Sequence, residues 1–419
     1  MPTFISKYVY TFTILVGTII FLRPFSFVHV GDAIIYFKGT SEMFSGVDLY
    51  EIDRADFGTR FFNGPVWGLW LWPLTVLPES IGLLIFRLLS VLASAAIFFI
   101  VSKRTLKREY PLYLLFFLMF SIRMNTNLGQ GAAIAYLCFV LSAYLLFNFR
   151  TLQNSLYVNI AAALLFVFAS NYKPQLGVLL FAFAVLRKRW VFISSSLIAI
   201  CIVEYLLALL KFQVSYLDWL KLLLERTSRL YLGGSQNIFG PWSLLGEFID
   251  FNVESFMVVV NISLLVSLYF ISRSAKVRVP TAKDFELSLV FLSFGSLIVA
   301  YSPLQDSFLI TCIYFSWLLE RKFRNYSILN SIVLSLFFLP TEQSLRNYII
   351  LIGVTAVIAH FSGVVDIKLY LPTSLTILAL QEYLNYDHKI YDLAGVGVIL
   401  ASFIILKVAH KQKNIDEIP

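Results

Sequence analysis

Charged residues are scarce in this chain. Only 14 % of its 419 residues are Asp, Glu, Lys or Arg, whereas 59 % are hydrophobic and the mean hydropathy is +0.79. Soluble domains carry roughly 25 % charged residues. Apolar runs recur along the whole length, and no stretch of soluble composition is long enough for a second domain. The sequence therefore predicts an all-α, polytopic integral membrane protein with a single domain over residues 1–419.

Cysteine is scarce too, and its positions exclude two kinds of site. Cys138, Cys201 and Cys312 all lie inside apolar runs, where cysteine behaves as a small hydrophobe. Their spacing fits neither a disulfide framework nor a zinc site. A small-x-small cleavage site is also missing after the first apolar run, so residues 8–22 are expected to be a retained span and not a signal peptide.

The basic residues set the expected orientation in the membrane. Short basic loops are typical of the cytoplasmic side. With Lys7 inside, the first span runs outward and the second returns at about 81–101, with both termini in the cytoplasm and a plasma (inner) membrane as the expected location. The net charge of +8 then reflects loop orientation and does not indicate nucleic acid. The basic clusters are 102–109, 147–150, 187–190, 272–283, 320–324 and 407–413.

The Trp-rich segment 61–79 is expected to be interfacial or re-entrant, because a full crossing there would invert every later loop. The architecture predicted is a bundle of about 12–14 transmembrane helices with a first outer loop at 23–80 and a second large outer loop at 211–254. The further spans expected are 110–122, 130–148, 156–170, 174–187, 190–210, 255–272, 285–301, 305–320, 327–340, 347–361, 368–381 and 390–408.

Segments on the expected outer side are rich in Asn, Gln, Gly and Pro and carry isolated charges. Each lies at a helix end, where backbone groups are free to bind a ligand. Taken singly, each also fits an ordinary polar loop. Together they favour a binding site on the outer face. They are 29–37, 123–131, 171–175, 226–243, 301–307, 340–346 and 385–389.

Lys173 is the most distinctive of these charges. It stands in "LFVFASNYKPQLGVLLFAF", with apolar residues on both sides and a proline directly after it. A lysine inside the bilayer costs roughly 2.5–3.5 kcal/mol on insertion scales. Two interpretations remain open. Either the helix break lines a cavity in which the ammonium binds a lipid phosphate, or a short outer hairpin lets the lysine extend to the headgroups.

Arginines and amides nearby offer further contacts. Guanidinium groups match phosphate oxygens in bidentate fashion, although such arginines also commonly face lipid headgroups. Amides suit sugar hydroxyls, and Asn237 equally fits a helix cap before Pro241. The candidate substrate and phosphate contacts, besides Lys173, are Arg123, Asn127, Gln130, Arg229, Asn237 and Asp306.

Several short motifs follow one another in a characteristic order. In sequence they are "GDAIIYF", "SGVDLY", "GPVWGLWLWPLTVLPE", "NLGQGAAIAYLCF", "NYKPQLGVLL", "QNIFGPWSLL" and "YSPLQDSFL". In this order the chain resembles glycosyltransferase family 87, which consists of integral-membrane enzymes of the GT-C class. The resemblance covers most of residues 1–320. Some members of the family carry a histidine shortly after the "S-P" turn, whereas this chain has Asp306 near that position.

The resemblance implies transfer of a hexose, commonly mannose, from a polyprenyl-phosphate-sugar donor to a lipid or glycan acceptor on the non-cytoplasmic face. It implies no metal ion and no other cofactor. The first-loop aspartate, here Asp32, corresponds to the general base. A carboxylate can take the proton that a sugar hydroxyl loses as it attacks the anomeric carbon. A single carboxylate fits direct displacement with inversion, unlike the carboxylate pair of hydrolases.

Asp32 also stands out by its surroundings. It lies in the apolar context "HVGDAII", where desolvation would raise its pKa. The other acids of the loop are in polar surroundings: Glu42, Asp48, Glu51, Asp53 and Asp56. A helix N-cap for residues 33–44 is the competing interpretation. His29, close to Asp32, is expected to be a bystander.

Two other functions stay open. A flippase or transporter of lipid-linked sugars would also need cations in an apolar cavity, but it should show internal repeats and several deep charges, and here only Arg87 and Glu204 lie deep in spans. A polysaccharide polymerase or ligase would also have many spans and outer arginines, typically with its large outer loop late in the chain. The outer loops at 23–80 and 211–255 favour the glycosyltransferase.

Overall fold

The structure is a computed structural model, and it describes residues 31–50, 63–105, 131–148, 155–222 and 366–384. Seven isolated positions are described as well: 285, 288, 289, 292, 328, 331 and 332. Within these residues every regular element is a helix and none is a strand, which confirms the all-α prediction for this part of the chain. The helices are α2 (Gly31–Phe44), α3 (Pro65–Thr75), α4 (Glu79–Thr105), α6 (Ala132–Asn148), α7 (Leu156–Ser170), α8 (Pro174–Leu186), α9 (Trp190–Leu209) and α17 (Ile367–Leu384).

The predicted spans agree closely with the described helices. The span expected at 156–170 coincides with α7, and those expected at 130–148, 174–187 and 190–210 match α6, α8 and α9 to within two residues. The agreement follows from helix-breaking residues, since Pro174 and the polar residues 187–189 interrupt the apolar runs. Eight of the predicted spans lie wholly or largely outside the described residues.

Length decides which helices can cross a bilayer. Of the described helices, two are long and apolar enough, namely α4 over Glu79–Ile97 and α9 over Trp190–Leu209. Helices α7 and α8 are apolar but have 15 and 13 residues, so they are about 20–23 Å long against a hydrocarbon core of about 30 Å. The structure therefore supports membrane association, while the expected 12–14 spans stay a prediction.

The Trp-rich segment of the first outer loop forms α3. This helix has 11 residues and is about 16 Å long, too short for a crossing. Gly64 precedes it, Pro65 opens it, and Pro73 lies within it. Its length agrees with the interfacial or re-entrant segment expected from the sequence.

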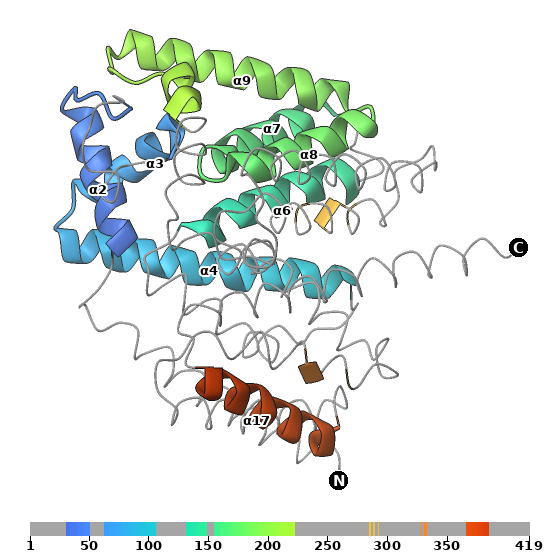
Figure 1. Ribbon diagram of the computed structural model, residues 1–419. Coiled ribbons are helices and arrows are strands. Elements are labelled where there is room, and N and C mark those ends of the chain that lie inside the picture. The colour runs from blue at the N-terminus through green and yellow to red at the C-terminus, as the bar shows by residue number, and fades with distance from the viewer. Residues whose placement is uncertain are drawn as a thin grey trace, which may run out of the picture.

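The described helices have two distinct ends (Figure 1). At one end lie α2, α3 and residues 211–222, which Figure 1 shows at the left. At the opposite end α4 stops within the basic sequence "SKRT", α6 stops at Asn148, and residues 187–189 join α8 to α9. The Arg189 guanidinium lies 5.6 Å from the centre of the Phe147 ring there. We call these the α2–α3 end and the basic end.

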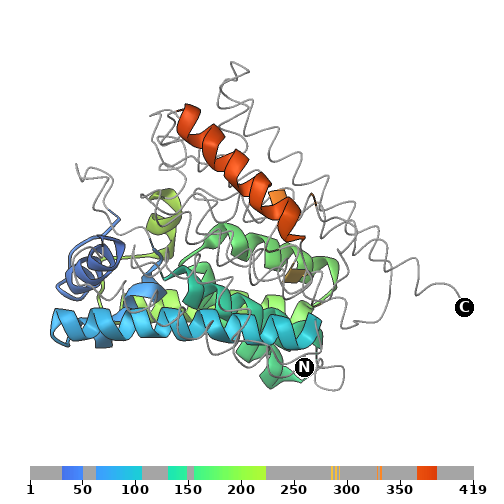
Figure 2. The ribbon, with the colours of Figure 1, turned by 90° about the horizontal axis from the view of Figure 1, so that it is seen from below.

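A core of aromatic and aliphatic side chains joins the α2–α3 end to the rest of the bundle. Figure 2 shows α2 beside the start of α4. The Phe37 ring packs edge-on against Phe86 of α4, with centroids 6.2 Å apart. The same ring lies against Gly82, where an added Cβ would be 2.9 Å from the Cε2 atom of Phe37. Between α6 and α7, the buried Ser142 hydroxyl donates to the Ala162 carbonyl at 2.9 Å. These contacts fix α2 on α4 and α6 on α7.

Candidate functional site

The centre of the α2–α3 end is the turn at residues 171–173 between α7 and α8. Asn171 continues from α7 with helical φ and ψ of −69° and −19°. Lys173 has left the helix, with φ −132° and ψ 77°, because the proline that follows it disfavours the helical conformation. Pro174 then opens α8, where its missing N–H costs nothing. The sequence "NYKP" therefore builds a tight helical hairpin with Lys173 in its turn.

Lys173 lies in the turn between α7 and α8, as both interpretations of this residue expect. Its side chain is half-buried, and the ammonium lies 5.7 Å from the centre of the Tyr172 ring. A cation over an aromatic face gains about 0.5–2 kcal/mol. The ammonium is thus held at the α2–α3 end of the bundle and keeps access to solvent.

The neighbouring Tyr172 joins three segments that are distant in sequence. Its hydroxyl lies 3.1 Å from that of Tyr36 on α2, in a buried pair. Its ring packs on Trp67 of α3 with centroids 4.6 Å apart. Gly131, which precedes α6, leaves no room for a side chain, since a Cβ there would lie 2.6 Å from Cη2 of Trp67 and 3.1 Å from Cε2 of Tyr172. The glycine is required by this close approach.

Asn171 binds the backbone at the start of α3. Its side-chain oxygen accepts from the Val66 N–H at 3.2 Å, and its backbone carbonyl accepts from the Gly64 N–H. The side-chain nitrogen donates to the Val167 carbonyl at 2.8 Å and to the Tyr216 hydroxyl. Only 1 % of Asn171 is exposed. One buried amide therefore joins α7, the start of α3 and the segment that follows α9.

The middle of the first outer loop is fixed by a turn and a tyrosine. Gly46 adopts φ +79°, which favours glycine, directly after α2. The Asp48 carboxylate accepts from the Tyr50 N–H at 2.9 Å, as in an Asx-turn. The Tyr50 hydroxyl donates to the Asn63 carbonyl at 2.8 Å. The loop is thereby closed between Tyr50 and the residue that precedes Gly64.

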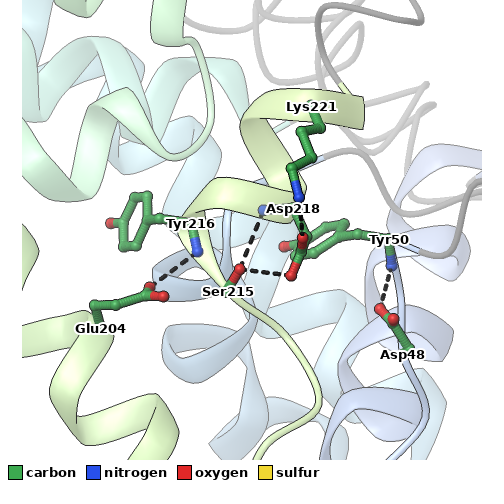
Figure 3. Close-up of polar contacts among 7 residues, drawn as sticks. All are labelled: Asp48, Tyr50, Glu204, Ser215, Tyr216, Asp218 and Lys221. Atoms are coloured by element: carbon green, nitrogen blue, oxygen red, sulfur yellow. Dashed lines mark hydrogen bonds and ion pairs between the residues drawn. The ribbon is translucent and has the colours of Figure 1, made fainter.

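The segment after α9 packs on the same end (Figure 3). The Glu204 carboxylate of α9 accepts from the Tyr216 N–H at 2.9 Å. The Ser215 hydroxyl donates to Asp218 at 2.6 Å and accepts from the Asp218 N–H at 3.1 Å, a capping arrangement at the start of the helical turn 216–222. Lys221 pairs with Asp218 at 3.2 Å on the surface. Glu204 therefore anchors a helix start.

Two tyrosines of this end keep their protons over the physiological range. Burial raises the pKa of Tyr50 well above its ordinary value, helped by the nearby Tyr216 and Asp48. Burial also raises the pKa of Tyr216, against the hydrogen bond from Asn171 and together with Glu204. Both phenols are therefore neutral hydroxyls that act as hydrogen-bond donors and acceptors, and neither serves as a base.

Some buried polar atoms at this end make no hydrogen bond in the described part of the chain. They are the Nδ2 atom of Asn63, the Nε1 atom of Trp67 and the Oγ1 atom of Thr40. A buried donor without a partner costs about 1–3 kcal/mol, so such groups call for an explanation. The Trp67 indole lies against Gly131, since a Cβ there would be 2.6 Å from its Cη2 atom.

Of the predicted site residues, two fall in the described chain. Asp32 lies on α2, at the start of the described part of that helix. It stands one turn before Tyr36, whose hydroxyl meets Tyr172 beside Lys173. Helix α2 and the 171–173 turn thus bring the two positions to one end. Outside the described residues lie Arg123, Asn127, Gln130, Arg229, Asn237 and Asp306.

The sequence analysis missed four residues that build this end. Two of them, Tyr36 and Tyr50, close the quoted motifs "GDAIIY" and "SGVDLY", and a fixed spacing from Asp32 and Gly46 was the available signal. Asn171 opens the segment 171–175, which was expected to belong to the site, but an Asn in a turn is too ordinary to stand out beside Lys173. Tyr216 belongs to no motif that the sequence analysis used. In the described residues no three His, Cys, Asp or Glu side chains gather as metal ligands would.

The sequence pattern of glycosyltransferase family 87 matches residues 61–303, which is more than half of the chain. The matched region includes α3, α4 and α6 to α9, with Asn171 and Lys173, and it begins after Asp32. Neither the curated proteins nor the solved structures give a match to this chain. The suspected family is confirmed: the chain belongs to glycosyltransferase family 87.

Proposed function

We propose that this glycosyltransferase moves a hexose of mannose type from a polyprenyl-phosphate-sugar donor to a lipid or glycan acceptor. The reaction takes place at the α2–α3 end, which faces the non-cytoplasmic side of the plasma membrane. The basic end then faces the cytoplasm, in accord with the preference of basic residues for that side. The transfer inverts the anomeric centre and needs no metal ion.

One observation carries this proposal: segments that are distant in sequence place an acid and a cation at the same end of the bundle. Asp32 is one helical turn from Tyr36, whose hydroxyl lies 3.1 Å from that of Tyr172, the residue next to Lys173. A carboxylate can remove the acceptor proton. An ammonium can neutralise the lipid phosphate as it departs, which makes the phosphate a better leaving group.

The polar atoms around this position suit a carbohydrate. The unpaired N–H groups of Asn63 and Trp67 are donors for hydroxyl or phosphate oxygens. The Tyr36 and Tyr172 hydroxyls accept and donate. The aromatic cluster of Tyr36, Trp67 and Tyr172 is buried, so it would support the binding position as a rigid base.

Transfer of label from polyprenyl-phosphate-mannose tests the proposal. Membranes that contain the wild type should transfer label into lipid or glycan, and Asp32→Asn should lower the rate by about 10²–10⁴-fold, the usual contribution of a general base. Glu42→Gln is the matched control on the same helix, since Glu42 forms a long 4.0 Å ion pair with the exposed Lys38. Its activity should stay within about twofold of the wild type, as expected for a surface pair worth well under 1 kcal/mol.

Three results would each contradict a part of this proposal. Full activity of Asp32→Asn at equal expression would leave an enzyme with another base. Loss of activity on chelation by EDTA would refute metal independence. No transfer from mannose or glucose donors would favour a flippase or a polymerase.

A further inference from the structure

We propose that Asn171 is the positioning residue of this site: its amide sets the place of Lys173 relative to the returning first outer loop. The inference deepens the proposed function and rests on it, because Lys173 is taken to hold the donor phosphate. Asn171 itself does not touch the substrate. It acts through the turn that it opens and through the backbone that it binds.

The contacts of the amide are almost complete. The oxygen accepts from the Val66 N–H, and the nitrogen donates to the Val167 carbonyl and to the Tyr216 hydroxyl. An Asn side chain can make four hydrogen bonds, and three are made here inside a buried site. Bonds in such an environment are costly to leave unmade, so the amide has one orientation. Backbone atoms on two elements are thereby held to α7.

Gly64 packs directly against the Asn171 side chain in addition to the hydrogen bonds. A Cβ at Gly64 would lie 2.7 Å from Cγ of Asn171 and closer still to its Oδ1 atom. The Gly64 N–H also donates to the Asn171 carbonyl. The first outer loop therefore returns directly over the amide, and a shift of the amide would move the start of α3 and Trp67.

The amide is anchored from the other side by the segment after α9. Tyr216 receives the second N–H of Asn171, and its own N–H is held by the Glu204 carboxylate at 2.9 Å. The Tyr216 side chain is buried. The start of the second outer loop thus sets the orientation of the Asn171 amide, and Asn171 in turn sets the turn that carries Lys173.

A double-mutant cycle separates positioning from general stability. Asn171→Ala should raise the KM for polyprenyl-phosphate-mannose about tenfold or more and also lower kcat, since Lys173 binds the phosphate before transfer and neutralises it as it departs. In a Lys173→Ala background the same Asn171→Ala change should have almost no further effect on KM. Additive effects on KM would overturn the inference, because independent sites add whereas a residue that acts through another does not.

Conservative variants sharpen this result. Tyr216→Phe removes only a hydroxyl and should raise the donor KM in the same direction as Asn171→Ala. Tyr205→Phe makes the same change at a side chain that is 68 % exposed on α9, and it should leave KM unchanged. A Tyr216→Phe enzyme with wild-type KM would contradict the role of the second outer loop.

A measurement without catalysis keeps the test independent of the proposed reaction. In a chain whose three native cysteines are replaced by alanine, a Lys173→Cys thiol is labelled with a maleimide in native membranes. Asn171→Ala and Tyr216→Phe should each speed this labelling at least about threefold, because the turn is released. Equal rates in all three proteins would refute the inference. If the wild type transfers sugar from no donor while these rates change, the proposed function fails and the positioning role of Asn171 stands.

Discussion

Replacement of Gly131 by alanine is the sharpest steric test of the packing at the α2–α3 end. The added Cβ would lie 2.6 Å from Cη2 of Trp67, closer still to Cζ2, and 3.1 Å from Cε2 of Tyr172. The Trp67 side chain is completely buried. Neither ring has free space on its far side, because Trp67 also packs on Phe168 with centroids 5.4 Å apart.

The magnitude follows from the cost of overpacking. Extra methyl groups in a filled core typically destabilise a protein by about 1–3 kcal/mol. We expect Gly131→Ala to fall in the upper half of this range, since the nearest atoms belong to rigid rings and not to the flexible end of a side chain. Displacement of Tyr172 would also move Lys173, so transfer activity should fall by more than the loss of folded protein explains.

The assay is equilibrium unfolding by increasing SDS in mixed micelles, followed by far-ultraviolet circular dichroism. The new methyl group meets the six-membered ring of the Trp67 indole, and Trp67→Phe makes this side chain smaller by one ring. The double variant Gly131→Ala with Trp67→Phe should therefore be more stable than the sum of the single effects, by about 1 kcal/mol or more. Trp190→Phe makes the same change at a side chain that is 59 % exposed, and its effect should simply add to that of Gly131→Ala.

Strict additivity between Gly131→Ala and Trp67→Phe would refute the reasoning. It would mean that the two residues do not touch, and the placement of α3 against the start of α6 would then be wrong. A Gly131→Ala protein as stable as the wild type would lead to the same conclusion.

Three further predictions concern neighbouring residues. Tyr36→Phe and Tyr172→Phe should each cost about 1 kcal/mol of unfolding free energy, and the double variant should cost hardly more than either single one, as measured by the same SDS unfolding, since both remove one hydrogen bond. Gly46→Ala should destabilise by about 1–2 kcal/mol, because φ is +79° there, whereas no steric clash adds to the cost. The hydrogen bond from Ser215 lowers the pKa of Asp218, so its stabilisation is present above the unfolded-state pKa near 4 and is lost as pH falls through the lower folded-state pKa. Ser215→Ala should make the thermal stability measured between pH 5 and pH 3 less dependent on pH.

Helix positions could be predicted well from this sequence because the breaks are local. Pro174 and the basic residues 187–189 end their helices through backbone chemistry and charge, which need no knowledge of the rest of the fold. The cap role of Asp32 stays a prediction, because the residues that precede Gly31 lie outside the described part of the chain.

The site could be predicted only in part, since some of its residues stand out by their local sequence and others depend on partners that are distant in sequence. Lys173 and Asp32 are conspicuous because a charge in apolar surroundings is costly wherever it is placed. The role of Asn171 depends on Val66 and Tyr216, which are 105 and 45 residues away, so no local pattern could reveal it. Polar residues that bind backbone look like ordinary turn residues until the partners are seen.

The same distinction explains Glu204, which the sequence alone grouped with Arg87 as a charge deep in a span. A carboxylate near the end of an apolar helix is a candidate for an ion pathway in a transporter. In the structure it accepts the N–H of Tyr216 and so starts the helical turn that holds the Asn171 amide. A charge that satisfies a helix terminus is explained by architecture. This contact gives one of the two deep charges an architectural role, and it makes the segment after α9 a structural partner of the loop that returns through Gly64 and Val66.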